Sequence, residues 1–206
     1  MTAHQETVRT FIATAISTEA RRVLEEAGGR LCQDIPQGVG WVRPEGIHLT
    51  LKFLGNIRPE MVGRVLDSLA APAAMSAPFQ LGLSGRLGVF PNSRRPRVLW
   101  AGIDGDLAAL SELQEAVEEA MKNLGFSPEE RPYSPHLTLG RVRRGVSDAA
   151  LTKISSSVTA AQLPGAQPWQ VDSFHLFQTD LKPSGSVHTV LGSVTLDAPN
   201  VAPGRP

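Results

Sequence analysis

The stretches that decide the fold are His48-Leu49-Thr50-Leu51 and His136-Leu137-Thr138-Leu139, the same four residues at two places in the chain. Leucine and threonine suit the pleated, half-buried surface of a β-strand, so each copy predicts the middle of a strand. Side chains alternate between the two faces of a strand. We therefore expect each copy to place its histidine and threonine on one face, about 7 Å apart, and its leucines on the other.

A proline-containing turn introduces each copy, at Pro44 and at Pro135. A predicted helix follows each copy, over residues 59–70 and 148–158, and further β-segments come after each helix. This repetition indicates an internal duplication. We expect an α+β fold of two pseudo-symmetric lobes, with mainly antiparallel sheet, helices outside and a cleft between the lobes.

Periodicity and capping signals place the other elements. Ser17 and Ser147 are predicted helix N-caps, and Gly28-Gly29 is predicted to end the first helix. The sequence predicts strands over 8–16, 79–89, 97–103, 170–178 and 187–195, helices over 20–27 and 106–124, and a turn over 179–185. We expect one bilobal domain over residues 8–197, between flexible ends at 1–7 and 198–206.

Composition narrows the classes of function. The 206 residues carry 20 basic and 20 acidic side chains, so no overall charge attracts a polyanion, although a local basic site remains open. Cys32 is the only cysteine, which excludes an intrachain disulfide and a thiolate metal cluster. No segment has the pattern of a secretory signal or a membrane span, so we expect a cytoplasmic protein with no membrane partner.

The paired motif predicts acid–base chemistry. Histidine can give and take a proton near neutral pH, and a threonine hydroxyl can donate a hydrogen bond to a phosphoryl oxygen. Strict alternation adds Lys52 to the face of His48 and Thr50, and a face with imidazole, hydroxyl and ammonium groups suits a phosphate. One such copy would be an ordinary strand with a half-exposed histidine; two copies in phase favour a site.

The sequence resembles the two-histidine (2H) phosphoesterases, and among them the RNA 2′,3′-cyclic phosphodiesterases, also called 2′-5′ RNA ligases. The two His-x-Thr-x copies carry this resemblance. It extends over roughly residues 8–195 and includes Phe11-Ile12-Ala13, Trp41 to Glu45, Lys52 to Gly55, Gly88 to Pro91, Pro96 to Gly102, Arg131 to Arg141 and Leu181 to Gly185.

The resemblance implies hydrolysis, without a metal or cofactor, of 2′,3′-cyclic phosphate ends of RNA, or of small cyclic nucleotides, to 2′-phosphomonoesters. It implies that His48 is the proton donor, that His136 is the proton acceptor, and that Thr50 and Thr138 hold the phosphoryl oxygens. The residues by themselves leave the direction of proton transfer open. Run in reverse with a 5′-hydroxyl, the same pair would join RNA ends by a 2′-5′ bond.

Further candidates for substrate binding are Lys52, Arg141, Tyr133 and Phe90. Strict alternation points Arg141 away from His136, so only a bulge at Gly140 would turn it into the site; otherwise it is a surface or ion-pairing residue. Tyr133 and Phe90 could stack on a base, although such aromatic residues are more often packing residues. His175 and His188 could line the cleft, but we expect structural roles for both.

Two other functions remain open. A histidine-based metal enzyme would need more ligands than the motifs supply. A non-catalytic module for RNA ends or nucleotides would use His48 and His136 only to bind phosphate. We expect a monomer, because the charge is balanced and no helix shows an apolar face left over.

Overall fold

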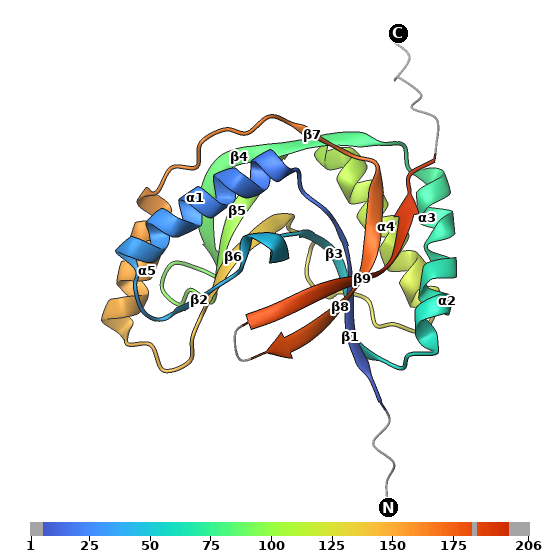
Figure 1. Ribbon diagram of the computed structural model, residues 1–206, viewed down its shortest axis with the longest axis horizontal. Helices are drawn as coiled ribbons and strands as arrows, with labels where there is room; N and C mark the ends of the chain where they lie inside the picture. The colour runs from blue at the N-terminus through green and yellow to red at the C-terminus, as the bar shows by residue number, and fades with distance from the viewer. Residues whose placement is uncertain (1–5, 183–184, 198–206) are drawn as a thin grey trace, which may run out of the picture.

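The computed structural model describes residues 6–182 and 185–197. All β-strands in this part of the chain belong to one antiparallel sheet, in the order β7-β4-β5-β6-β3-β1-β8-β9, with β2 paired to β6. The sheet is strongly curled (Figure 1). Its strands are β1 (Val8–Thr14), β2 (Val39–Trp41), β3 (Leu49–Ile57), β4 (Phe79–Phe90), β5 (Val98–Gly105), β6 (His136–Val142), β7 (Trp169–Val171), β8 (Ser173–Lys182) and β9 (Gly185–Thr195).

The helices lie on the outside of the sheet in two groups. Helices α1 and α5 lie together beyond β4 and β2, and α2, α3 and α4 lie beyond β3 and β9 (Figure 1). Their bounds are α1 (Thr18–Asp34), α2 (Met61–Ser68), α3 (Ala70–Met75), α4 (Leu107–Asn123) and α5 (Asp148–Ala160), with a 3-10 turn η1 (Pro44–Gly46) before β3. The predicted α+β fold, with antiparallel sheet and outer helices, is confirmed.

Both predicted helix caps are present. The Ser17 hydroxyl accepts a hydrogen bond from the Ala20 amide at 3.0 Å, and the Ser147 hydroxyl accepts one from the Ala150 amide at 3.4 Å. Each bond satisfies an amide that has no partner within the first turn of its helix. The sequence therefore fixes where α1 and α5 begin.

The prediction that Gly28-Gly29 ends the first helix was wrong, because α1 continues to Asp34. Neither glycine has the positive φ of a helix-ending residue. Ala27 and Leu31 on either side are buried in the core, and their burial offsets a cost of about 1 kcal/mol per helical glycine. Tertiary packing thus overrides a local stop signal.

Two other boundaries differ from prediction. The helix expected over 59–70 is replaced by two helices, α2 and α3. Pro72 in α3 has no backbone amide, so it cannot donate the hydrogen bond that would continue α2 without a break. Of the turn expected over 179–185, residues 179–182 belong to β8 and pair with β9 up to Lys182 opposite Gly185, and residues 183–184 lie outside the described residues. Of the predicted flexible ends, residues 1–5 and 198–206 lie outside the described residues.

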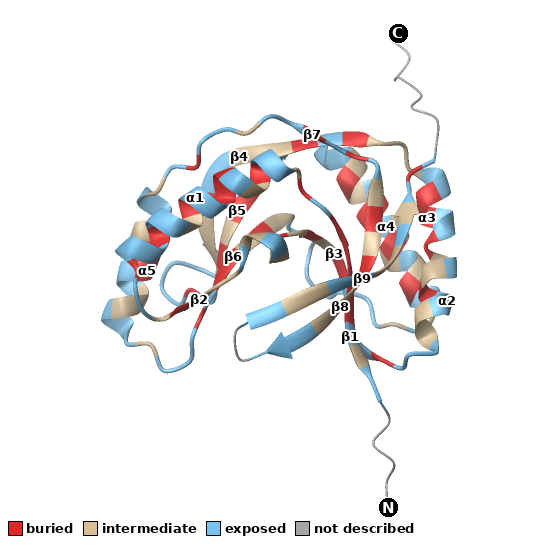
Figure 2. Cartoon of the chain, in the orientation of Figure 1, coloured by how far each residue is buried: buried red, intermediate tan, exposed pale blue. Residues whose placement is uncertain are grey.

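The two motifs lie on neighbouring strands at the centre of the sheet. Leu49 of β3 is paired with Leu137 of β6, and both side chains have no exposed surface. Buried residues follow these strands and the inner faces of the helices (Figure 2). Each motif stands at the start of its strand instead of the middle, since β3 begins at Leu49 and β6 at His136. The buried leucines therefore anchor two histidines at adjacent strand ends.

Candidate active site

The backbone fixes both motif histidines in the same way. His48 Nδ1 lies 2.8 Å from the Gly46 carbonyl oxygen, and His136 Nδ1 lies 2.8 Å from the Ser134 carbonyl oxygen. A carbonyl oxygen only accepts, so each Nδ1 carries a hydrogen and donates it. Each ring therefore keeps its Nε2 for a reacting partner, as a base when neutral and as an acid when protonated.

The two threonines complete a roughly symmetric arrangement. The antiparallel register around Leu49 and Leu137 sets Thr50 on the side of His136, and Thr138 on the side of His48. Both threonines are half-buried. The two strands thus bring two imidazoles and two hydroxyls to one region, as the sequence predicted.

Burial and neighbouring charge hold both histidines neutral. The pKa of His48 is lowered from 6.5 to about 4, first by burial and then by the charges of His188, Arg141 and His136, while the hydrogen bond to the Gly46 carbonyl opposes the shift. Burial, followed by the charge of Arg141, also lowers the pKa of His136, against the effect of the Ser134 carbonyl. A buried imidazolium loses hydration, which is why burial favours the neutral ring. The three side chains therefore lie near enough for their charges to interact.

A β-bulge after Thr50 corrects the position predicted for Lys52. Ala13 of β1 lies opposite Thr50 and Ile12 lies opposite Lys52, so Leu51 has no partner and the faces shift by one residue. The Lys52 side chain is buried instead and binds Glu118 of α4 at 2.6 Å. Lys52 is therefore not a phosphate-binding cation.

The same bulge brings an unpredicted aromatic ring toward the site. Phe53 pairs with Phe11, and the two ring centroids are 6.1 Å apart. Phe53 is 58% exposed, which is unusual for a phenylalanine. No alternation argument identifies this residue, because the bulge reverses its face.

A matching bulge in the second motif places Arg141. Trp100 of β5 lies opposite Thr138 and Leu99 lies opposite Gly140, so Leu139 is the unpaired residue. This returns Arg141 to the face of His136, where its charge acts on both histidines. The bulge proposed at Gly140 thus exists one residue earlier.

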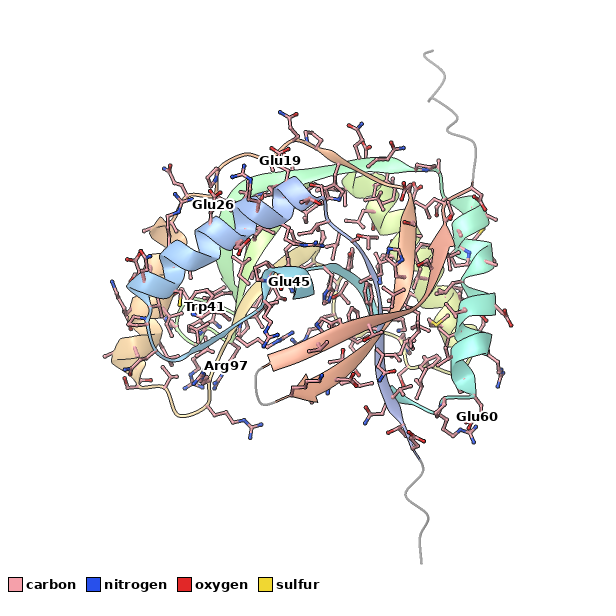
Figure 3. The ribbon with its side chains drawn as sticks, viewed as in Figure 1. Glu19, Glu26, Trp41, Glu45, Glu60 and Arg97 are labelled. Carbon is pink, nitrogen blue, oxygen red and sulfur yellow. The ribbon has the colours of Figure 1, made fainter. Side chains whose placement is uncertain are left out.

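Strand β6 is held along both edges at this point. Trp41 of β2 pairs with Gly140, and the Val142 amide donates to the Arg97 carbonyl at 2.9 Å. A side chain at Gly140 would lie 2.7 Å from a methyl group of Val39, so glycine permits the close approach of β2. Trp41 and Arg97 thus lie next to this part of β6, and Glu45 lies on η1, before the first motif (Figure 3).

Aromatic rings surround His48. Its imidazole stacks on Phe11 at 4.4 Å, and Phe11 stacks on Phe177 at 5.1 Å. His188 meets His48 edge-on at 5.1 Å, and its Nδ1 lies 3.0 Å from the Thr179 hydroxyl. His188 therefore lies directly beside His48, whereas the sequence favoured a structural role for it over a place in the cleft. The sequence did not indicate this position, because the face on which His188 lies depends on the β-bulge in the pairing of β8 with β9.

The remaining candidates are Phe90, Tyr133 and His175, and each has a different set of contacts. Phe90 lies edge-on to His136 at 5.0 Å and stacks on Trp100 at 5.1 Å, so it is placed to contact a substrate. The Tyr133 hydroxyl donates to the Thr50 carbonyl at 3.0 Å, which makes the ring a link between the motifs. His175 Nδ1 lies 2.8 Å from the Ser193 hydroxyl, farther along β8.

Within residues 6–182 and 185–197, no three or more histidine, cysteine, aspartate or glutamate side chains gather in a way that could hold a metal ion. None of the helices in the same ranges is long and apolar enough to cross a membrane.

The curled sheet and the paired His-x-Thr-x strands define a two-histidine phosphoesterase. A family model described as the 2′-5′ RNA ligase superfamily matches residues 20–183. The chain belongs to this superfamily, as the sequence resemblance implied.

Named relatives agree with this family. A protein of Geobacillus stearothermophilus named RNA 2′,3′-cyclic phosphodiesterase is 33% identical over 95% of this chain, which spans 60% of that relative's length. A Thermus thermophilus protein of the same name is 34% identical, with 92% of this chain and 90% of the relative covered. A crystal structure of a Thermus thermophilus protein superposes with a TM-score of 0.72 at 30% identity, covering 92% of this chain and 98% of the other.

Proposed function

We propose that the protein hydrolyses 2′,3′-cyclic phosphate ends of RNA to 2′-phosphomonoesters, without a metal, by an acid–base pair of His48 and His136. One observation carries the proposal. Two imidazoles on adjacent strands have Nδ1 tied to a backbone carbonyl, and each keeps Nε2 for proton transfer. Relatives named RNA 2′,3′-cyclic phosphodiesterase support the choice of substrate.

Each step of the reaction has a group to serve it. His136 Nε2 takes a proton from water as the oxygen attacks phosphorus, and the bond from phosphorus to the 3′-oxygen breaks. His48 Nε2–H gives its proton to that leaving oxygen, which becomes a 3′-hydroxyl. The phosphate remains on the 2′-oxygen. Thr50 and Thr138 donate hydrogen bonds to the non-bridging oxygens.

The substrate itself supplies the missing charge. With a pKa of about 4, His48 is mostly neutral in the empty site at pH 7. A cyclic phosphate carries one negative charge, and an anion beside an imidazole favours its protonated form. Binding therefore prepares His48 as the acid, and Arg141 offers a second positive charge to the same anion. The direction of transfer follows the pattern of the family.

The same site serves RNA ligation as well as hydrolysis. A 5′-hydroxyl of a second RNA end can replace water as the nucleophile, and the product is then a 2′-5′ phosphodiester. By microscopic reversibility the two histidines exchange roles when that bond is cleaved. No additional catalytic residue is required. We propose RNA as the partner, and a monomer as the working form.

A single incubation tests the proposal. The protein is mixed with an oligoribonucleotide that ends in a 2′,3′-cyclic phosphate, in EDTA, and phosphorus NMR identifies the product. We expect turnover to the 2′-phosphate. Binding without turnover would favour the non-catalytic phosphate-binding module. Activity that EDTA abolishes and a divalent metal restores would favour a metal enzyme. A 3′-phosphate product would invert the leaving group.

A further inference from the structure

Hydrogen bonds and one ion pair link the strand of the first motif to the segment that leads into the second. Residues 124–135 connect α4 to β6, whose first residue is His136. Most of the connection between Gly125 and Ser134 is exposed. Such a segment is mobile unless its backbone is tied down. In this protein one tie comes from the buried Lys52 of β3 with Glu118 of α4, and the other from the half-buried Tyr133 of the connection itself.

The first tie is the ammonium group of Lys52. It binds Glu118 Oε1 at 2.6 Å and the Ser127 carbonyl oxygen at 3.0 Å. The same Glu118 oxygen accepts a hydrogen bond from the Glu129 amide at 2.8 Å. Lys52 is 6% exposed, so this charge pair is sheltered from water and holds its partners more firmly than a surface pair would.

The second tie is the Tyr133 hydroxyl, which donates to the carbonyl oxygen of Thr50 at 3.0 Å. Burial raises the pKa of Tyr133 well above its ordinary value, so the phenol remains a donor throughout the range of neutral pH. The next residue, Ser134, provides the carbonyl that orients His136 Nδ1. A bond made by the first motif is therefore one residue from the bond that sets the tautomer of the second histidine.

We propose that Lys52 and Tyr133 are positioning residues, which fix the Ser134 carbonyl relative to β3 and so hold the His136 imidazole in register with the first motif. The importance of this register rests on the proposed function. His48 needs no such tie, because its own carbonyl partner, Gly46, ends the hydrogen-bonded turn η1.

Three variants and one control test the proposal. Tyr133→Phe removes only the hydroxyl. Lys52→Met removes the ammonium but leaves Glu118 unpaired, which can prevent folding, so Lys52→Met/Glu118→Met removes the buried pair as a unit. Lys122→Met is the matched control, because Lys122 forms an exposed ion pair with Glu119 on the same helix.

Two readouts separate positioning from general loosening. For Tyr133→Phe and the double variant, kcat on a nucleoside 2′,3′-cyclic phosphate should fall about tenfold or more, because misplaced catalytic groups are costly, while KM changes by less than about twofold. Nitrogen-15 NMR should show His136 losing its single Nδ1–H tautomer while His48 keeps its own. Lys122→Met should match the wild type in both readouts.

Other results overturn the proposal. An unchanged kcat with an unchanged His136 tautomer would do so, as would a fall in kcat with no change at His136. Equal changes at both histidines would show loosening of the whole sheet instead. If the wild-type protein does not turn over the substrate, the proposed function fails, but the tautomer measurement still decides the role of Lys52 and Tyr133.

Discussion

The imidazole of His48 stacks on the ring of Phe11, with centroids 4.4 Å apart and 25° between the planes. Phe11 is 3% exposed, so one face of the imidazole is covered by a buried apolar ring. This contact removes water from the imidazole and is part of the reason that its pKa lies near 4. Core packing thus helps to set the proton affinity of the histidine that we propose as the acid.

The first prediction concerns stability against pH. The unfolded chain binds a proton at His48 near pH 6.5, whereas the native protein does so only near pH 4. The native state therefore binds fewer protons within this window, and stability is lost as the pH falls through it. The loss from His48 should be about 3 kcal/mol between pH 7 and pH 4. Urea unfolding of the wild type and of His48→Gln measures it; equal slopes in both proteins would refute the assignment.

The second prediction concerns the pH dependence of activity. The reaction needs one protonated and one neutral histidine, and the pKa values of His48 and His136 in the free protein are both lowered from 6.5. The optimum of kcat/KM should therefore lie below pH 6.5. The optimum of kcat should be more alkaline, because the bound anion raises both pKa values. A kcat/KM that continues to rise above pH 7 would contradict this account.

The third prediction concerns Arg141. Its guanidinium lowers the pKa of both histidines and faces the site only because of the bulge at Leu139. Arg141→Met should raise both histidine pKa values, seen by NMR titration, and raise KM for an anionic substrate about tenfold. Arg144→Met is the control, because Arg144 is exposed beyond the end of β6. If the two variants have the same KM, Arg141 does not bind the phosphate.

The fourth prediction tests the continuation of α1. A Cβ at Gly28 would meet no atom within 4 Å, and Gly28 does not have a positive φ. Gly28→Ala should therefore stabilise the protein by about 0.5 to 1 kcal/mol, by reducing the freedom of the unfolded chain and by favouring the helix. Thermal unfolding measures the change. Destabilisation would mean that the helix ends at this glycine.

The sequence predicted what depends on local pattern. Strand alternation and the leucines at 49 and 137 were sufficient to place two histidines on the same side of buried strands. The sequence also predicted the caps at Ser17 and Ser147, because a helix cap is a local contact between a hydroxyl and the backbone amide three residues later.

What the sequence did not reveal depends on partners elsewhere in the chain. The bulges at Leu51 and Leu139 appear only in the register against β1 and β5, yet they decide which way Lys52 and Arg141 face. Lys52 has a carboxylate partner 66 residues away, which no spacing rule finds. His188 joined the site through the pairing of β8 with β9, a long-range relationship as well.

The acid–base pair is tested most directly by kcat for His48→Ala, His136→Ala and the double variant on a 2′,3′-cyclic phosphate substrate in EDTA. We expect each single change to lower kcat by about 100-fold or more, while substrate affinity changes far less. The double variant should lose little more than either single variant, because the two histidines act as a unit. If either single variant keeps kcat within about tenfold of the wild type, the two-histidine mechanism is wrong.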